Sequence, residues 1–549
     1  MSTHAIARPP LPANEPVRGY APGSPERASL RARLAAMRSE RPELPCLIGG
    51  REVRTGRLVQ AVEPHDRARV LADVHEAGAA EVESAIRAGV EAQRAWGRTP
   101  WETRAAVLLR AAELLAGPWR DTLNAATMLG QSKTPHQAEI DAACETIDFL
   151  RFNPAFLARL LAEQPESAPG TWNRLDYRPL EGFVLAISPF NFTSIGVNLA
   201  TAPLLLGNAV VWKPASTAMP AAYHAARLLE AAGLPPGVLN LVFAPGPVVA
   251  DVALASPDLA GVHFTGSTGV FQGIWRTVGQ SVDRYRSYPR LVGETGGKGF
   301  VVAHASADVD ALATALVRGA FEYQGQKCSA ASRAFVPRSL WPALRERLVE
   351  DVRSLRLGDP TDFASFAGAV IDERAFAKQR DAIAEARAHG DTEIVVGGGT
   401  DDAVGWFVEP TVVETRDPSF RLLRDELFGP VLTVLTYADD RYEEVLDLVD
   451  RGAPYALTGA VFARDRAAID LALERLRDAA GNVYVNDKPT GAVVGQQPFG
   501  GGRASGTNDK AGSLWNLIRW TSPRTIKETF VPPTDYRYPF LEPDAGADA

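Results

Sequence analysis

The sequence predicts an α/β protein built from two α/β blocks in series. In the first block, short β-branched runs at residues 182–188 and 208–213 indicate strands, and the Ala- and Leu-rich stretch 216–233 indicates a helix. The second block begins with "GFVVAH" at 299–304, which indicates a strand, and "VDALATALVRGAFEY" at 309–323, which indicates a helix. Alternating strands and helices are typical of a parallel sheet with helices on both faces. Two such blocks predict two domains with a cleft between them.

Further segments flank these blocks. Residues 1–45 predict a proline-rich arm followed by a charged helix, whose start is marked by Ser24. Residues 79–160 have helical apolar spacing. The alternating stretch 171–180 predicts an exposed β-hairpin, and the tail 520–532 predicts another strand. Because an exposed strand edge invites pairing, these two segments are candidates for contact with another subunit.

Composition argues against several classes of protein. The 549 residues carry a net charge of −8 with no basic block, which argues against nucleic acid as a partner. No apolar run approaches the roughly 20 residues of a membrane helix, and the first 20 residues lack the apolar centre of a secretory signal. Three cysteines, Cys46, Cys144 and Cys328, cannot form a disulfide framework, and their spacing suits no metal site. We therefore expect a cytoplasmic protein that needs no metal ion.

Cys328 lies in the stretch "FEYQGQKCSAASR", residues 321–333, after Lys327 and before two small residues. A lone cysteine is most often a small buried hydrophobic residue. The alternative is a reactive thiol, whose thiolate form is the nucleophile. The stretch by itself does not choose between these two interpretations.

Two more stretches offer side chains suited to catalysis. In "LVGETGGKG", residues 291–299, Glu294 follows an apolar strand and precedes two glycines. A carboxyl group in that setting has a raised pKa and can act as a general base toward water, although a helix-capping or solvated glutamate fits equally well. In "ISPFNF", residues 187–192, Asn191 follows a strand end, where its amide can donate to an oxyanion or form an ordinary Asx turn.

Two stretches suggest a nucleotide site. Residues 263–275, "HFTGSTGVFQGIW", predict a strand–turn–helix that offers backbone N–H groups to a phosphate. The stretch is not the G-x-G-x-x-G fingerprint, so an ordinary turn explains it as well. Lys213 ends a strand, which is where ligands bind in open α/β sheets, and a lysine there can reach ribose hydroxyls or simply be solvated.

Seven motifs occur in order and together resemble the aldehyde dehydrogenase superfamily: "ISPFNF", "WKPAS", "FTGSTG", "GETGGK", "GQKCSA", "DELFGP" and "PFGG". The resemblance runs from about residue 15 to about residue 535. Longer stretches, such as "SYPRLVGETGGKGF" and "VGQQPFGGGRASGTNDKAG", are similar to the L-glutamate γ-semialdehyde dehydrogenases, which catalyse the second oxidation of proline catabolism. The chain has no room for a fused proline dehydrogenase. The resemblance therefore implies the single-function form, linked in function to a separate proline dehydrogenase.

The resemblance implies a thiol mechanism with NAD as cofactor. Cys328 attacks the aldehyde carbon, and the Asn191 amide and the Cys328 backbone N–H stabilise the oxyanion that forms. After NAD accepts the hydride, Glu294 activates the water that hydrolyses the thioester, which gives glutamate.

The resemblance also implies binding residues. For NAD these are Ser188 and Lys213 at the adenosine half, Gly266, Ser267 and Val270 under the pyrophosphate, and Glu426 and Phe428 at the nicotinamide ribose. For the small-molecule substrate they are the Gly491 and Ala492 N–H groups with the Ser329 hydroxyl at the carboxylate, Phe192 and Phe499 on the aliphatic chain, Glu145 at the α-ammonium, and Lys327 beside the nucleophile. Many strictly NAD-dependent relatives have a glutamate where this chain has Ser216, so some NADP use stays open.

The implied architecture is the aldehyde dehydrogenase fold. Its parts are an arm at 1–45, a Rossmann-like NAD-binding domain at 46–166 and 183–293, an α/β catalytic domain at 294–497, and a small β oligomerisation element at 167–182 and 519–545. The last element implies a homodimer or a higher homo-oligomer. Three alternatives remain: a catalytically silent structural protein, a coenzyme-A-acylating enzyme, or a dehydrogenase of another carboxylate-bearing semialdehyde. The combination of Cys328, Glu294 and Asn191 argues against the first, and Glu294 argues against the second.

Overall fold

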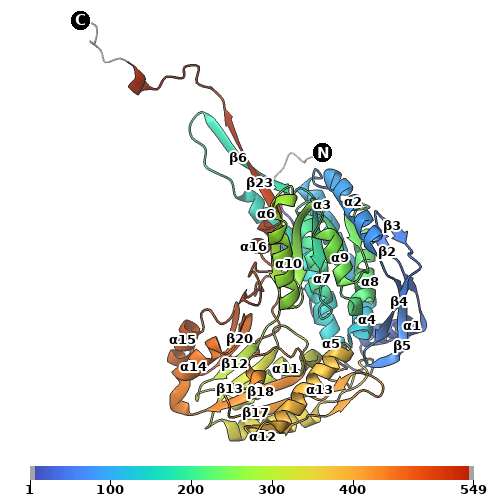
Figure 1. Cartoon of the computed structure of the whole chain (residues 1–549), viewed down its shortest axis with the longest axis vertical. Coiled ribbons are helices and arrows are strands. Elements are labelled where there is room, and N and C mark those ends of the chain that lie inside the picture. Colours follow the sequence, from blue (N-terminus) through green and yellow to red (C-terminus); the bar gives the residue numbers. More distant parts are fainter. Residues whose placement is uncertain (1–6, 543–549) are drawn as a thin grey trace.

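Two seven-stranded sheets with helices packed on them form the body of the molecule (Figure 1). The computed structural model describes residues 7–542, so residues 1–6 of the predicted arm and 543–545 of the predicted oligomerisation element lie outside the described residues. The first sheet consists, in spatial order, of β11 (Arg290–Glu294), β10 (Leu259–Thr265), β7 (Phe183–Ile187), β8 (Ala209–Lys213), β9 (Leu239–Leu241), β2 (Cys46–Ile48) and β3 (Arg51–Val53). The second consists of β14 (Thr392–Val396), β17 (Thr411–Thr415), β18 (Val431–Tyr437), β13 (Ala331–Pro337), β12 (Gly299–Ala303), β20 (Thr458–Phe462) and β21 (Asn482–Val485).

Both sheets are mainly parallel, as the alternating sequence predicts. In the first sheet β11 to β9 are parallel, and β2 and β3 extend it with antiparallel pairs. In the second sheet only β14 is antiparallel to its neighbour. Strands such as β10 are buried along their whole length because helices cover both faces, which explains their continuous apolar sequence. The predicted pair of α/β blocks is confirmed.

The helices fall into two groups that follow the two sheets (Figure 1). With the first sheet are α2 (Ala79–Trp96), α3 (Trp101–Ala116), α4 (Arg120–Gln131), α5 (Pro135–Ala138), η1 (Glu139–Glu145, a π-helix), α6 (Thr146–Ala162), α7 (Thr193–Leu205), α8 (Met219–Ala231), α9 (Gly246–Ala253) and α10 (Thr268–Gln280). With the second are α11 (Val309–Phe321), α12 (Trp341–Ser354), α13 (Glu373–Ala388), α14 (Tyr442–Arg451) and α15 (Arg466–Arg475). Smaller sheets are formed by β1 (Glu43–Leu44), β5 (Asp66–His75) and β4 (Leu58–Glu63), by β15 (Thr400–Asp401) and β16 (Phe407–Val408), and by β19 (Tyr455–Ala456) and β22 (Gly502–Arg503).

The predicted helix after Ser24 is confirmed as α1 (Pro25–Ser39). The Ser24 Oγ accepts a hydrogen bond from the Arg27 N–H at 3.3 Å and so caps the helix. One face of α1 buries Leu30 and Leu34 in a core shared with α4. The N-terminal segment is therefore packed onto the first half of the molecule.

The stretch 171–180 is not a hairpin, and the prediction is wrong on this point. It forms one strand, β6 (Thr171–Pro179), which pairs antiparallel with β23 (Thr521–Thr529) over nine residue pairs. A hairpin pattern and a strand paired with a distant segment have the same alternation of side chains, so local sequence cannot distinguish them. The two-stranded ribbon projects from the body (Figure 1).

The C-terminal part of the chain returns to the first half before it enters the ribbon. The short helix α16 (Leu514–Ile518) places Leu517 in the first core, and Trp520 follows it there with no exposed surface. Trp520 packs on His263 of β10, with ring centroids 4.6 Å apart, and its carbonyl accepts a hydrogen bond from Asn208 Nδ2 at 2.9 Å. Residues near the end of the chain thus complete the core of the first sheet.

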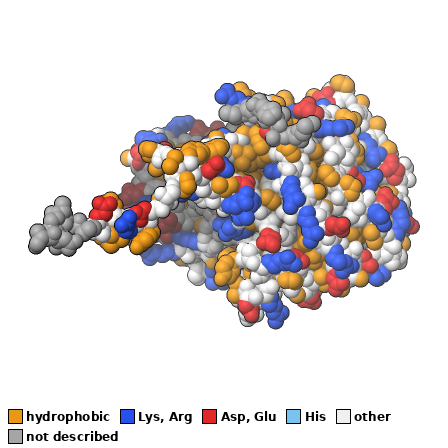
Figure 2. All heavy atoms as spheres, turned by 90° about the horizontal axis from the view of Figure 1, so that it is seen from above, with side chains coloured by type: hydrophobic (Ala, Val, Ile, Leu, Met, Phe, Trp, Pro, Cys, Tyr) orange, Lys and Arg blue, Asp and Glu red, His pale blue; other side chains and the backbone are white. Residues whose placement is uncertain are grey.

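The surface is mixed in charge. Figure 2 shows lysine and arginine interspersed with aspartate and glutamate over the face seen from above. Within residues 7–542, none of the helices combines the length and the apolar character needed to cross a membrane.

Candidate active site

Cys328 lies in a tight loop between η4 (Glu322–Gly325) and β13. Three successive residues before it, Tyr323, Gln324 and Gly325, have positive φ angles of 52°, 53° and 63°. Left-handed backbone at tyrosine and glutamine is uncommon and persists only where the surrounding structure enforces it. The loop therefore holds the thiol in a fixed place.

The "GETGGKG" stretch runs directly beneath this loop. A Cβ atom added to Gly297 would lie 2.1 Å from the Cys328 carbonyl oxygen, and one added to Gly299 would lie 2.3 Å from that of Ala330. A Cβ atom on Gly296 would lie 2.3 Å from the Glu426 carboxylate. The glycines thus bring three motifs into contact, because any larger residue would separate them.

The Cys328 thiol is half-buried, and the carboxyl groups of Glu426 and Glu294 lie near it. Burial, with the nearby carboxyl groups of Glu426 and Glu294, raises the pKa of the Cys328 thiol to about 12, although the N–H groups of Cys328 and Ser329 act to lower it. At neutral pH the thiol is protonated, so attack on a carbonyl carbon requires a base that removes its proton.

Asn191 lies against the same loop. It is buried, and its Nδ2 donates a hydrogen bond to the Gln326 carbonyl at 3.0 Å, two residues before the thiol. The amide has a second N–H, which is available to an oxygen atom bound beside the sulfur. The structure therefore places Asn191 against the loop that carries Cys328.

Glu294 ends β11 and is held by a segment from the C-terminal region. Glu294 forms an antiparallel bridge with Gly506, and the Thr295 N–H donates to the Ser505 carbonyl at 2.8 Å. Burial raises the pKa of the Glu294 carboxyl well above its ordinary value, while the Gly501 N–H and the Lys510 ammonium act to lower it. The predicted rise is confirmed. Within residues 7–542, Glu294 Oε2 is buried without a hydrogen-bond partner, so it is free to accept a proton.

The carboxyl ends of β7, β8 and β10 meet at one edge of the first sheet. They carry Ser188, Lys213 and Gly266, so these three candidate NAD residues lie on neighbouring strands. Ser188 Oγ accepts a hydrogen bond from Trp212 Nε1 at 2.9 Å. Burial alone lowers the pKa of Lys213, since no carboxylate of the described residues lies close enough to oppose it.

The start of α10 fits a dinucleotide phosphate. Ser267 is its N-cap and makes no capping hydrogen bond with its side chain, so the first N–H groups of the helix remain available. Val270 is 54% exposed and presents an apolar surface beside them. These residues fit the adenosine and pyrophosphate parts of NAD.

Glu426 and Phe428 lie where this edge meets the Cys328 loop. Glu426 Oε1 accepts a hydrogen bond from the Gly297 N–H at 2.7 Å, and burial raises the pKa of its carboxyl. Phe428 has a φ of 60° and packs edge-on against Phe190 at 5.8 Å. Both residues therefore adjoin the loop and can hold the ribose nearest the reacting carbon.

The predicted carboxylate anchor lies beside the nucleophile. Ser329 Oγ and Thr490 Oγ1 are 2.8 Å apart, which joins the Cys328 loop to Gly491. Gly491 has a φ of 94°, a conformation that favours glycine, and Ala492 follows it. Thr490 was not predicted, because a threonine after proline gives no catalytic signal in sequence.

Other predicted substrate residues are held by neighbouring side chains. Glu145 ends η1, and its Oε2 accepts a hydrogen bond from Ser194 Oγ at 2.9 Å. Burial, with the Asp141 carboxylate, raises the pKa of Glu145 to about 8. Lys327 is paired with Glu322 at 3.4 Å, and burial lowers its pKa to about 8. Phe499 exchanges backbone hydrogen bonds with Ala511 at 3.0 and 2.8 Å.

A buried pair missed by sequence reasoning supports Phe192. Lys133 Nζ lies 2.7 Å from Asp141 and is placed over the Phe192 and Tyr323 rings at 4.2 and 4.4 Å. Asp141 also accepts hydrogen bonds from the N–H groups of Thr193 and Ser194, at the start of α7. The pair fixes the backbone that follows Asn191. Neither residue lies in one of the seven motifs, so no sequence signal singles out the pair.

The family model described as aldehyde dehydrogenase family matches residues 52–526. The chain belongs to the aldehyde dehydrogenase family. This aldehyde dehydrogenase is 49% identical over 544 residues to the mitochondrial delta-1-pyrroline-5-carboxylate dehydrogenase of Dictyostelium discoideum, with 98% of each chain covered. It is 48% identical over 531 residues to the human enzyme of that name, with 96% of this chain and 94% of the relative covered.

Solved structures agree with this placement. The delta-pyrroline-5-carboxylate dehydrogenase of Mycobacterium tuberculosis bound with NAD has a TM-score of 0.95 at 57% identity, with 98% of this chain and 100% of that chain covered. Proline utilization A of Bdellovibrio bacteriovorus has a TM-score of 0.89 at 28% identity, with 96% of this chain but 54% of that chain covered. The predicted fold and family are confirmed.

The predicted cytoplasmic location is wrong by the same comparison. The relatives from Dictyostelium discoideum and human are both named as mitochondrial proteins. The prediction depended on the small number of cysteines, which argues against a disulfide-rich secreted protein. That argument does not distinguish between compartments in which proteins lack disulfides.

Proposed function

We propose that this aldehyde dehydrogenase oxidises L-glutamate γ-semialdehyde, formed from 1-pyrroline-5-carboxylate, to L-glutamate with NAD. The observation that carries the proposal is the contact of the Ser329 and Thr490 hydroxyls at 2.8 Å, which joins the Cys328 loop to Gly491 and supports a carboxylate anchor there. The relatives and solved structures named above support the substrate and the cofactor. This reaction would be the second oxidation of proline catabolism, and its product would be L-glutamate.

The first step would be attack of Cys328 on the aldehyde carbon. The thiol proton would pass to solvent water, so that Glu294, which has a raised pKa and an oxygen without a hydrogen-bond partner among the described residues, stays available as the base for the later hydrolysis. The S–C bond forms as the C=O bond becomes an oxyanion. The second N–H of Asn191 and the Cys328 backbone N–H would stabilise that oxyanion.

NAD, when bound, supplies the acceptor for the hydride that leaves the substrate carbon. Lys213, the N-terminus of α10 and Glu426 would hold it with its reactive ring near Cys328. The thioester left on Cys328 would be hydrolysed by water. Glu294 would take a proton from that water as it attacks, the acyl C–S bond would break, and the proton would return to the sulfur as glutamate leaves.

The ribbon formed by β6 and β23 supports association into a homodimer or higher homo-oligomer. Trp172 on β6 is 52% exposed, and Phe530 just after β23 is 60% exposed. Large apolar side chains on a projecting ribbon are typical of surfaces that another protein covers. The likeness to proline utilization A of Bdellovibrio bacteriovorus over only about half of that chain supports a functional link to a separate proline dehydrogenase.

A substrate panel tests the proposed function. Purified protein is supplied with NAD and with L-glutamate γ-semialdehyde, succinic semialdehyde or pentanal, and NADH formation is followed by absorbance. We expect the highest kcat/KM for L-glutamate γ-semialdehyde. Equal efficiency with pentanal would reduce the assignment to a general aldehyde dehydrogenase, and the highest efficiency with succinic semialdehyde would favour a different carboxylate-bearing substrate.

A further inference from the structure

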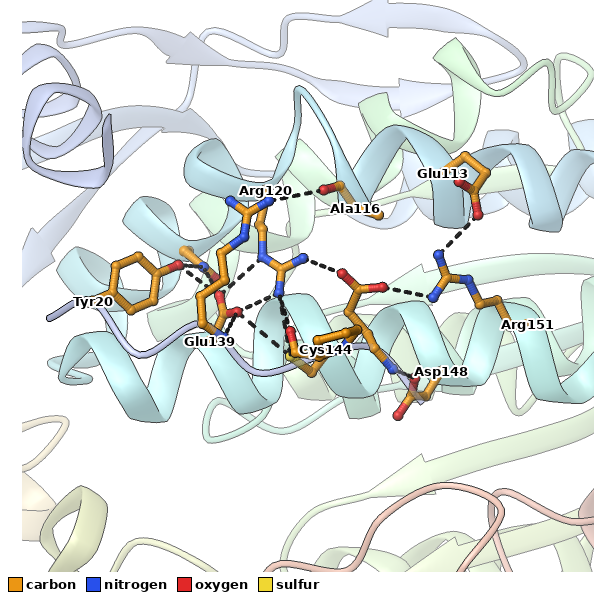
Figure 3. A network of polar contacts seen from close by, with 12 residues as sticks. Tyr20, Glu113, Ala116, Arg120, Glu139, Cys144, Asp148 and Arg151 are labelled. Atoms are coloured by element: carbon orange, nitrogen blue, oxygen red, sulfur yellow. Dashed lines mark hydrogen bonds and ion pairs between the residues drawn. The ribbon is translucent and has the colours of Figure 1, made fainter. Parts of the chain in front are cut away.

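An extended segment of the N-terminal arm, residues 14–20, lies across the helices that carry Glu145. Figure 3 shows this contact, in which Arg120 of α4 and Glu139 of η1 lie between Tyr20 on one side and Asp148 and Arg151 of α6 on the other. None of these residues enters the chemistry described above. The network therefore needs an explanation of its own.

Buried charges fix this segment, here called the arm strap, to the helices. The side chains of Arg120 and Glu139 are fully buried and paired with each other. Arg120 also donates to the Glu15 carboxylate at 2.5 Å, and Glu139 accepts hydrogen bonds from the Arg18 N–H at 2.9 Å and the Tyr20 hydroxyl at 2.7 Å. Buried charges are costly unless they are paired and hydrogen-bonded, so the contacts from the arm strap help to stabilise Arg120 of α4 and Glu139 of η1.

Asn14, at the start of the arm strap, joins two elements of the candidate substrate site. Its Nδ2 donates to Asp148 Oδ2 and to the Val494 carbonyl, both at 2.8 Å. Its Oδ1 accepts a hydrogen bond from Gln496 Nε2 at 2.9 Å. Asp148 lies one helical turn after Glu145, and Val494 lies two residues after Ala492. One side chain thus links the helix that bears Glu145 to the loop that begins at Gly491.

The same loop is closely seated on α6. Gly495 has a φ of 82°, and a Cβ atom added to it would lie 2.2 Å from the Phe152 ring. The Glu15 N–H donates to the second oxygen of Asp148 at 2.7 Å, so the arm strap provides two donors to that carboxylate. The relative positions of loop and helix therefore depend on contacts that the arm strap completes.

The distance between the Gly491–Ala492 loop and Glu145 matters because of the class of substrate. In an α-amino acid semialdehyde, the carboxylate and the ammonium are attached to one carbon atom, so the groups that hold them must keep a fixed separation. We infer, on the basis of the proposed function, that the arm strap is a specificity element: Asn14 positions the Gly491–Ala492 loop relative to Glu145 so that both charged groups of one α-carbon are bound together. Asn14 is a positioning residue, since it contacts neither the substrate nor the cofactor.

The test compares Asn14→Ala with Tyr20→Phe in the full chain. Both variants remove hydrogen bonds between the arm strap and the helices, but only Asn14 reaches the loop. With NAD saturating, kcat and KM are measured for L-glutamate γ-semialdehyde and for pentanal, which lacks both charged groups. We expect Asn14→Ala to raise KM for the semialdehyde about tenfold and to leave kcat/KM for pentanal within about twofold, while Tyr20→Phe leaves the ratio of the two efficiencies unchanged.

Gln496→Ala provides a second variant in case Asn14→Ala does not fold. Gln496 is exposed, and its replacement removes one of the same hydrogen bonds from the loop side. We expect a smaller change in the same direction, about two- to threefold in the semialdehyde KM. Equal losses of efficiency with both aldehydes, or an unchanged preference in Asn14→Ala, would overturn this inference and leave the proposed function standing. If Asn14→Ala does not fold, the same outcomes in Gln496→Ala decide. A wild-type enzyme that shows no preference for the semialdehyde would overturn the proposed function and this inference with it.

Discussion

Among the described residues, Lys213 and the first N–H groups of α10 at the edge of the first sheet lack side-chain partners, whereas Asn191 and Ser329 beside Cys328 are already hydrogen-bonded. Lys213 has no opposing carboxylate nearby among the described residues, and the first turn of α10 has no side-chain cap. In contrast, Asn191 is bonded to the Cys328 loop and Ser329 to Thr490. A cofactor that enters and leaves needs free donors, while a reacting carbon needs groups that are held in place beforehand. The two regions therefore divide binding from chemistry, and each of the following variants tests that division.

The largest expected effect comes from removing the thiol. Cys328→Ala is expected to lower kcat/KM more than about a thousandfold, because no other group can form the covalent bond. NAD affinity, measured by titration calorimetry, is expected to stay within about twofold of the wild type, because the free donors lie on the other sheet. Loss of NAD binding in this variant would show that the two regions are not separable.

The next effect concerns the second half of the reaction. Glu294→Gln is expected to form about one NADH per active site in a rapid burst and then turn over slowly, since thioester hydrolysis needs a base. Stopped-flow absorbance measures both phases. A normal steady-state rate without a burst would contradict the assignment of Glu294.

The pH dependence follows from the direction of the Glu294 pKa. Burial raises that pKa, so the carboxyl becomes protonated at a higher pH than an ordinary glutamate. Because only the ionised form accepts a proton, kcat is expected to fall as the pH decreases through the raised pKa, by up to about tenfold per pH unit. A kcat that stays level down to the range of an unperturbed carboxyl would contradict this.

A smaller effect is expected at the anchor. Ser329→Ala is expected to weaken the preference for L-glutamate γ-semialdehyde over pentanal by about 1–2 kcal/mol, because one donor to the carboxylate is lost. Thr490→Val removes the same internal hydrogen bond from the loop side and keeps the Ser329 hydroxyl, so it is the matched control. If both variants lose the same preference, Ser329 acts by holding the loop and not by contacting the substrate.

The smallest effect concerns the choice of nucleotide. Ser216→Glu is expected to lower kcat/KM with NADP about fivefold more than with NAD, because a carboxylate there would repel a 2′-phosphate across solvent. Initial rates with the two cofactors measure the ratio. An unchanged ratio would indicate that Ser216 lies too far from the ribose to influence it.

Much of this architecture could be predicted from the sequence because its signals are local. β7 and β8 are continuous apolar runs, and Ser24 marks a helix start by itself. The approach of Glu294 to Cys328 could not be predicted from the sequence alone. In the fold, the Cys328 and Ala330 carbonyls lie against Gly297 and Gly299, which explains why these two positions need glycine. The ordered motifs gave the residues, and the structure gives their contacts.

Other features have no local signal. The π-helical turn η1 interrupts a stretch that has ordinary helical spacing, and it alters which residues face α7. The pairing of β6 with β23 and the reach of Asn14 to Val494 join segments hundreds of residues apart. Such contacts depend on tertiary packing, and a single sequence without a fold does not contain them in readable form.

The return of Trp520 to the first sheet has a consequence for how the chain is made. Synthesis proceeds from the N-terminus, and domains generally fold as units as they emerge. Here the strands β7 to β11 are complete by residue 294, yet their core lacks Leu517 and Trp520, and β11 lacks Gly506, until almost the whole chain has left the ribosome. During that interval the face of His263 on which Trp520 packs, and the edge strand β11, lack these contacts. A premature stop codon near position 510 would therefore remove Leu517 and Trp520 from the core of the part of the molecule that is translated first.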